Sequence, residues 1–351
     1  MSQVDQFSEQ RELLVKLVRI PSVTDNEEPC ARQLASFFEA HDREVWIDDI
    51  GNVRAPADDG VLLTSHIDTV PGEIPVRVDQ NDAGQDILWG RGSVDAKGPL
   101  AAMAVAAVRT GASFIGVVGE EVDSRGSFHV VDTRENQPDA VINGEPSGWD
   151  AMTLGYRGLL GGRYVATSES GHSSRPENNA IQDAIDWWNR VDEEFEHDEY
   201  VSVFDRVTCK PVEFHGGVSD DGLAVETTLE VKLRVPPTFT VDEVREIADG
   251  FLEVGTVNWY DRVEPVMQSP RTPVGRAFRA AIRQHGGDPR MLRKTGTSDM
   301  NVFADHWDCP MVTYGPGDSD LDHAPNEHIV LDEYDKSVAV LEDVTERLLE
   351  E

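Results

Sequence analysis

The chain has 351 residues, and its 66 acidic residues against 31 lysines and arginines give a formal net charge of -35. This balance argues against a nucleic-acid binder or a protein of anionic membranes, because both need clustered basic residues. Hydrophobic residues make up 39% of the chain, which is too many for a disordered protein. Only six basic residues are lysines. Excess carboxylate with few lysines is typical of proteins from a high-salt cytoplasm, where salt screens the repulsion between charges.

The cysteines and the N-terminal segment predict a cytoplasmic protein. Cys30, Cys209 and Cys309 lie far apart and form no CxxC pair, which fits a reducing compartment. The N-terminal segment carries charges throughout and has no apolar core before a cleavage site, so it does not resemble a signal peptide. No stretch approaches the ~20 apolar residues that a membrane span requires.

Helices and strands alternate up to about residue 150. The expected helices cover residues 9–19, 29–41 and 99–108, and the expected strands cover residues 44–48, 61–67, 114–119 and 140–143. The last two strands are uninterrupted apolar runs, as a sheet covered on both faces requires. The third helix is apolar nearly all round, which suits a helix packed onto that sheet. This part of the sequence predicts an α/β layer structure.

The middle of the chain has a different pattern. Strands are expected at residues 163–168 and 224–235, helices at 179–191 and 241–252, and then a helix from about 272, a short strand at 311–314 and a closing helix at 331–349. The strand at 224–235 alternates in polarity, as strands with one wet face do. We therefore expect one domain made of residues 1–155 and 268–351, and a smaller α+β domain of residues 156–267 inserted in it.

Histidine and carboxylate side chains lie at the ends of several of the expected strands. In SHIDTVP, His66 and Asp68 are spaced so that both can face one side of the chain, with Asp68 holding the second ring nitrogen of His66, or both can be surface residues. Asp95 lies between a glycine-rich loop and the apolar helix, where it is either a ligand or a helix cap. Two adjacent carboxylates, Glu120 and Glu121, end another apolar strand and repel each other unless a cation lies there or one is protonated.

Two further residues complete this set. Glu145 ends the next apolar strand in INGEPS, and His323 lies in the loop YGPGDSDLDHAPNEH. In open α/β sheets, ligands bind at the carboxyl ends of the strands, where these side chains would meet. Imidazole and carboxylate without thiolate suit zinc, cobalt or manganese. A bridging carboxylate would give each of two ions three protein ligands, so the sequence predicts a site for two divalent ions.

Five motifs resemble the two-zinc aminoacylase/carboxypeptidase family, which includes succinyl-diaminopimelate desuccinylase, acetylornithine deacetylase and glutamate carboxypeptidase. In this chain they read HIDTVP, GRGSVDAKG, GEE, GEPS and DHAPNEH, in the family's order and over nearly the whole chain. The resemblance implies a catalytic domain with a mixed sheet between helices, and an inserted α+β domain that acts as lid and forms a homodimer. It implies His66, Asp95 and Glu145 as ligands of one zinc, and Asp95, Glu121 and His323 as ligands of the other.

The resemblance also implies three catalytic roles. Asp68 would orient His66, and Glu120 would be the general base that takes a proton from the attacking water. His172, in SGHSSRPENNA, would reach the site of the partner subunit and stabilise the oxyanion. Without the family, His172 is a loop histidine with a structural or solvent-facing role.

Within the family, GYRGLLGGRY, KTGTSDMNVF and the His323 loop most resemble the branch that hydrolyses [amino-group carrier protein]-lysine or -ornithine. Such an enzyme releases lysine or ornithine from the γ-carboxyl of the C-terminal glutamate of a small acidic carrier protein, in lysine and arginine biosynthesis. The alternatives are a deacylase of small N-acyl amino acids, a dipeptidase or carboxypeptidase, and a metal-binding protein without activity. The presence of Glu120 together with the ligands argues against the last.

A basic stretch interrupts the acidic chain at residues 271–294, with seven basic residues against one acid. Arg276, Arg279 and Arg283 are spaced to share one face of a helix. We expect this face to receive the acidic carrier protein or to grip carboxylates of the substrate; the alternative is a solvated helix paired with nearby acids. Asp299, in GTSDMN, either receives a substrate ammonium group or caps the following helix.

Overall fold

The computed structural model describes residues 8–172, 174, 176–198 and 200–350, which divide into two compact units. The first unit contains residues 8–155, 268–293 and 298–350, and the second contains residues 156–267 and 294–297. The short segment 294–297 thus belongs with the inserted unit and not with the chain around it. In the part of the chain that is described, no helix has the length and apolar character needed to cross a bilayer.

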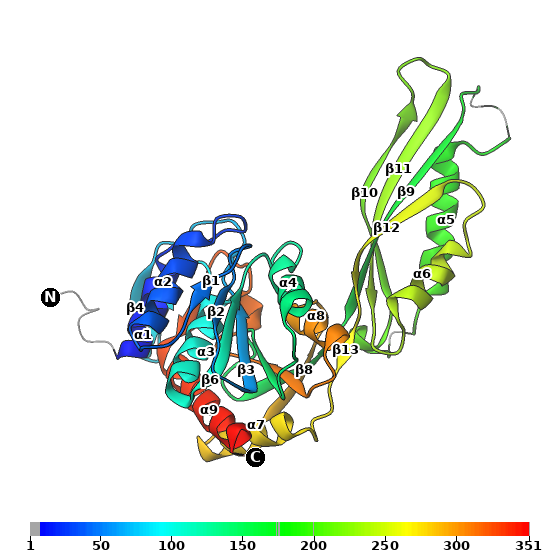
Figure 1. Cartoon of the computed structure of the whole chain (residues 1–351). Coiled ribbons are helices and arrows are strands. Elements are labelled where there is room, and N and C mark those ends of the chain that lie inside the picture. The colour runs from blue at the N-terminus through cyan, green and yellow to red at the C-terminus, as the bar shows by residue number, and fades with distance from the viewer. Residues whose placement is uncertain (1–7, 173, 175, 199, 351) are drawn as a thin grey trace. The chain divides into compact units, whose positions relative to one another are not determined.

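The first unit is built on a mixed sheet with the strand order β1-β2-β6-β3-β7-β15-β8 (Figure 1). The strands are β1 (Trp46–Ile47), β2 (Val53–Ala55), β3 (Asp58–His66), β6 (Ala112–Val117), β7 (Val141–Gly144), β8 (Ala151–Tyr156) and β15 (Met311–Tyr314), with β14 (Arg290–Lys294) beside β8. The four strands β6, β3, β7 and β15 are parallel, and their carboxyl ends therefore lie along one edge. Every residue of β6 and β7 is buried, as the apolar runs predicted.

Helices cover this sheet, and most of them bury their apolar side chains against its strands in one hydrophobic core. They are α1 (Glu9–Val18), α2 (Glu28–Glu39), α3 (Lys97–Thr110), α4 (Arg125–Thr133), α7 (Pro273–Gln284), α8 (Asp299–His306) and α9 (Leu331–Leu349). The predicted all-apolar helix is α3, which is buried from Lys97 to Ala107 and packs on β3 and β6, with α1 and α9 against it. It ends at Gly111, whose φ of +81° is the left-handed conformation that favours glycine after a helix.

A small antiparallel sheet, β16-β5-β4, lies in the same unit. Its strands are β4 (Arg77–Gln80), β5 (Asp86–Trp89) and β16 (His328–Val330). His328 lies opposite Trp89, so a segment near the end of the chain is paired with one that precedes Asp95. None of these three strands was expected from the sequence, because each is short and lacks a clear alternation of polarity.

The second unit is an antiparallel sheet of order β10-β11-β9-β12 with two helices, α5 and α6, against one of its faces (Figure 1). Its elements are β9 (Gly158–Glu169), α5 (Ala180–Glu194), β10 (Thr208–Val218), β11 (Ala224–Val235), α6 (Val241–Asp249), β12 (Thr256–Val263) and β13 (Val266–Met267). Burial alternates along β11, as its sequence predicted. In contrast, β10 is an edge strand that is exposed on both faces from Lys210 to Val218, which is why its sequence gave no strand signal.

Candidate metal centre

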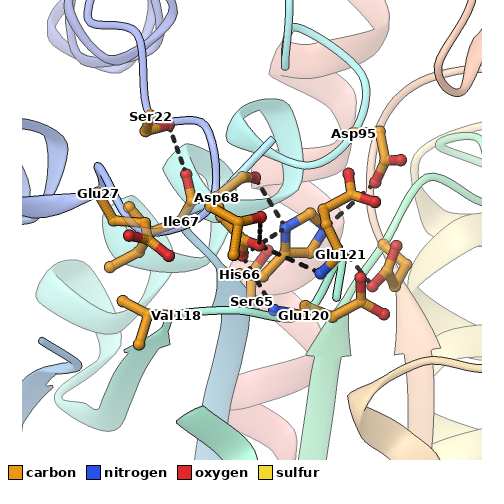
Figure 2. A network of polar contacts seen from close by, with 12 residues as sticks. Ser22, Glu27, Ser65, His66, Ile67, Asp68, Asp95, Val118, Glu120 and Glu121 are labelled. Atoms are coloured by element: carbon orange, nitrogen blue, oxygen red, sulfur yellow. Dashed lines mark hydrogen bonds and ion pairs between the residues drawn. The ribbon is translucent and has the colours of Figure 1, made fainter. Parts of the chain in front are cut away.

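The strand register brings the predicted site residues together at the carboxyl edge of the main sheet. His66, the last residue of β3, lies beside Val117 of β6, and Ser65 lies beside Gly144 of β7. The loop after β6 therefore carries Glu120 and Glu121 to His66, as Figure 2 shows, and the residue after β7 is Glu145. No long excursion of the chain is needed to place these four side chains at one edge.

Asp95 lies between the two predicted histidine ligands. Its Oδ1 is 3.1 Å from Nε2 of His66, and its Oδ2 is 3.1 Å from Nε2 of His323. Glu145 Oε1 lies 3.8 Å from Nε2 of His66, and Glu121 Oε2 lies 3.0 Å from Nε2 of His323. The ligand atoms of each group, His66–Asp95–Glu145 and Asp95–Glu121–His323, lie within 4.8 Å of one another. Each group has one imidazole and two carboxylates, and both share Asp95.

The ring of His66 is held by its second nitrogen. Nδ1 lies 3.0 Å from the backbone oxygen of Asp68 and 3.5 Å from the Oδ1 atom of the same residue. An N–H at Nδ1 therefore donates to the backbone carbonyl, and Nε2 faces Asp95, where a metal ion would take the place of the second ring proton. The predicted partner was the carboxylate of Asp68, and the structure brings the carbonyl closer.

The carboxylate of Asp68 has other, shorter contacts. It accepts hydrogen bonds from the backbone N–H groups of Glu120 and Glu121, both at 3.1 Å, and from the hydroxyl of Thr24 at 2.8 Å. Asp68 is fully buried, so these bonds fix the loop that carries the adjacent glutamates. The contribution of Thr24 was not expected, because it lies far from the other site residues in the sequence and belongs to no recognisable motif.

The electrostatics of this cluster favour a cation. Burial and the nearby Glu145 raise the pKa of Glu120 well above its usual value, and burial together with Asp95 raises that of Glu121 to about 7. The hydrogen bond to Asp95 raises the pKa of His323 to about 9, although burial opposes it. Burial would lower the pKa of His66, but bonds to Asp68 and Asp95 raise it well above 6.5.

The residues present fit a pair of divalent ions. In the metal-free protein, the protons on His66 and His323 supply positive charge beside the surrounding carboxylates. Two bound metal ions would supply this charge in their place. Oε1 of Glu121 is buried and has no hydrogen-bond partner among the described residues, so it is available to a metal ion. Nitrogen and oxygen ligands without sulfur, three to each group, suit zinc and its neighbours in the first transition series.

Metal binding is expected to release protons, because a ligating imidazole must be neutral. At neutral pH the metal-free protein holds His323, with its pKa of about 9, in the protonated form. The apparent zinc affinity should therefore rise with pH up to about 9 and fall as the solution becomes acidic. Calorimetric zinc titrations in buffers of different ionisation enthalpy measure the protons released. If no protons were released on zinc binding at pH 7, His323 would not be a metal ligand.

Asp299 is the first residue of α8 and is almost completely buried. The helix cap is Ser298, whose hydroxyl accepts the N–H of Met300, so the capping role considered for Asp299 belongs to its neighbour. Burial raises the pKa of Asp299 to about 6, and its charge acts on both Glu120 and His66. The structure thus places Asp299 close to the metal centre, and its contact with substrate stays a prediction.

The remaining predicted residues are not members of these two ligand groups. His172 belongs to the second unit, in an exposed segment where its Nδ1 lies 2.8 Å from Oγ of Ser174. Arg279 and Arg283 lie on α7. Glu327 was not singled out from the sequence although it is part of the motif DHAPNEH, and it is wholly buried beside the Asp95 loop.

Two His–carboxylate groups that share one carboxylate, at the carboxyl edge of an α/β sheet, are typical of metal-dependent hydrolases. The sequence pattern of peptidase family M20/M25/M40 matches residues 62–347, and the chain belongs to this family of hydrolases. It is 38% identical to the [LysW]-lysine hydrolase of Deinococcus radiodurans, over 97% of each chain. It is 30% identical to the [LysW]-lysine/[LysW]-ornithine hydrolase of Saccharolobus islandicus, over 92% of this chain and 91% of the relative.

A solved structure agrees with the fold. The M20 metallo-carboxypeptidase Sso-CP2 from Sulfolobus solfataricus superposes with a TM-score of 0.79 at 19% identity, over 98% of this chain and 100% of the other. The predicted combination of an α/β domain with mixed sheet and an α+β portion is thereby confirmed as the fold of this family.

Proposed function

We propose that this protein is a two-metal amide hydrolase that releases lysine or ornithine from the γ-carboxyl of the C-terminal glutamate of an amino-group carrier protein. The proposal rests on one observation above all: Asp95 places one oxygen against each of two histidines, in a chain similar over most of its length to hydrolases of [LysW]-lysine and [LysW]-ornithine. A cytoplasmic enzyme of lysine and arginine biosynthesis would have this substrate.

Two divalent ions, zinc in the first place and cobalt as the alternative, would be held by His66, Asp95 and Glu145 and by Asp95, Glu121 and His323. Such ions polarise an amide carbonyl and make water acidic enough to attack at neutral pH. The protein contributes the geometry, because buried bonds hold His66 and the Glu120–Glu121 loop in place before any substrate binds.

Glu120 is the general base of the proposed reaction. It belongs to neither ligand group, yet Asp68 holds its backbone beside them. It takes a proton from the water that adds to the amide carbon, and donates this proton to the α-amino nitrogen when the C–N bond breaks. Burial raises the pKa of its carboxyl group. A carboxyl group with a raised pKa holds the proton more readily between these two steps.

The second unit is proposed to act as lid and dimerisation domain. Its edge strand β10 exposes Val212, Phe214 and Val218, and one side of its backbone is paired with no other strand of the described residues. Long exposed edges of this kind pair with another chain, and a twofold axis would pair two copies of β10. Sedimentation equilibrium should give twice the mass of one chain, and a monomer would refute this assignment.

His172 is proposed to serve the active site of the partner subunit. Mixing two inactive variants, Glu120→Gln and His172→Ala, tests this directly, because a mixed dimer would hold one complete site. Random exchange of subunits should then restore up to about a quarter of the wild-type activity. If no activity returns although dimers exchange, His172 does not act across the interface.

A substrate comparison tests the function itself. Carrier-γ-glutamyl-lysine, carrier-γ-glutamyl-ornithine, acetylornithine and succinyl-diaminopimelate are offered side by side to the zinc- or cobalt-loaded enzyme in multimolar KCl. We expect free lysine or ornithine from the carrier-linked substrates. Faster hydrolysis of a small acyl amino acid would contradict the proposed carrier-linked substrate but not the proposed metal site. Absence of turnover on all four with metal bound would favour a non-catalytic protein.

The carrier is proposed to dock on the basic face of α7, formed by Arg276, Arg279 and Arg283. Val274, Phe278 and Ile282 bury the opposite face of this helix. The hydrogen bonds of the three guanidinium groups go to backbone carbonyls of residues 271, 275 and 279, and no carboxylate of the described chain lies within 4 Å of them. On a chain of charge -35, three neighbouring arginines without acidic partners suit an acidic protein.

Charge reversal separates this docking from a general charge effect. The double variant Arg279→Glu/Arg283→Glu should raise KM for the carrier-linked substrate about tenfold at low salt and less at high salt, because exposed charges are screened. KM for a small amide should not change. The matched control, Arg32→Glu/Arg77→Glu, alters the net charge equally at two exposed arginines elsewhere. Equal KM in both double variants would refute docking on α7.

A further inference from the structure

Glu327 is a fully buried carboxylate that belongs to neither ligand group. Its Oε1 accepts the backbone N–H groups of Val94 at 2.8 Å and of Asp95 at 3.1 Å. Its Oε2 accepts a hydrogen bond from Nη1 of Arg91 at 2.8 Å. All three partners lie in the loop that ends at the shared ligand Asp95, so one side chain holds this loop at several points.

The small sheet explains how Glu327 reaches that loop. Its strands β5 and β16 are antiparallel with His328 opposite Trp89, and the N–H of Gly90 lies 3.4 Å from the backbone oxygen of Glu327. The chain leaving β5 runs to Asp95, and the chain entering β16 comes from His323. The two loops thus start from one end of the same strand pair, and Glu327 joins them on the way to the metal centre.

This connection bears on the distance between the two ligands. Asp95 can bridge only if its backbone lies where each carboxylate oxygen reaches a different imidazole, as the two distances of 3.1 Å show. Among the described residues, Glu327 is the hydrogen-bond acceptor for the N–H groups of both Val94 and Asp95. Without it, two buried N–H groups would lose their partners, and the loop would rearrange to satisfy them.

We propose that Glu327 is a positioning residue that sets Asp95 against His323 and thereby determines the affinity of the centre for its metal ions. This inference rests on the proposed two-metal function. It assigns the role to the two backbone hydrogen bonds and not to the ion pair with Arg91. If Glu327 only stabilised the folded protein, its replacement would lower zinc affinity no more than the replacement of another buried residue.

Four variants of the full chain separate these roles by zinc titration calorimetry after treatment with a chelator. Glu327→Ala removes both backbone bonds and should weaken zinc binding about 10- to 100-fold. Glu327→Gln keeps an oxygen for both N–H groups and should bind zinc within a few-fold of wild type. Arg91→Gln removes the ion pair alone and should retain the wild-type affinity. Val344→Ala, at an equally buried position in α9, measures the effect of lost stability by itself.

Kinetics at saturating zinc provide a second readout. The variant Glu327→Ala should lower kcat with little change in KM, because the residue contacts ligands and not the substrate. Zinc affinity of Glu327→Ala equal to that of Val344→Ala would overturn the proposal. If Glu327→Ala fails to fold, a loss of affinity in Arg91→Gln larger than in Glu327→Gln would overturn it as well. Fewer than two zinc ions on the wild-type protein would refute the two-metal function itself, whatever the variants show.

Discussion

Replacement of Glu120 by glutamine is expected to lower kcat by a factor of about 10² to 10⁴ and to leave two metal ions bound. Glutamine has nearly the same shape and can keep the backbone bond to Asp68, but it cannot take up a proton. Because Glu120 lies outside both ligand groups, the number of ions should not change. Steady-state kinetics and metal analysis of the same preparation test both halves of this prediction.

The neighbouring residue is the matched control. Glu121→Gln alters the adjacent carboxylate, which belongs to the group with Asp95 and His323. It should reduce the metal content towards one ion, and excess zinc should recover part of the activity. The two variants differ by one position and by no net charge. If Glu120→Gln lost metal, or if it retained the wild-type kcat, the assignment of general base would be wrong.

Substitution of Asp95 by asparagine should have the broadest effect on the centre, because this residue serves both groups. Each ion would lose a charged ligand, and neither should remain bound at zinc concentrations that saturate the wild-type protein. Activity should fall below detection. Glu145→Gln, which affects the His66 group alone, should lose one ion and keep the other.

Thermal unfolding gives an independent measure of this loss. A ligand that binds only the folded state stabilises it by about 2.7 kcal/mol per site at a hundredfold excess over Kd. Zinc should therefore raise the Tm of the wild-type protein and leave that of Asp95→Asn unchanged. An equal rise in both proteins would show that the ions bind elsewhere.

The parts of the fold that follow from local pattern could be predicted from the sequence. β6, β7 and α3 are buried on all sides, so an unbroken apolar run was sufficient to identify them. β10 could not be identified, because it is exposed on both faces and exists only by its pairing with β11. The expected strand at residues 44–48 is reduced to Trp46–Ile47 for a related reason, since both of its residues are exposed.

The candidate site divides in the same way. His66 ends one predicted strand and Glu145 follows another, and the rule for parallel sheets was enough to expect them at one edge. His323 lies in a loop without periodicity, and only the resemblance to a known family joined it to Asp95. The hydrogen bonds of Asp68 and Glu327 to backbone N–H groups were beyond prediction, because they depend on how distant loops approach one another.

The order of the ligands along the chain has a consequence for biosynthesis. His66, Asp95 and Glu145 precede the inserted unit, whereas His323 follows it. On the ribosome, the residues of both groups can meet only after the segment that follows the inserted unit has emerged, because Glu327 holds the Asp95 loop and β15 pairs with β7. The inserted unit can therefore fold before the metal pair is complete. A chain released before residue 323 lacks a ligand of the second group and cannot hold both ions.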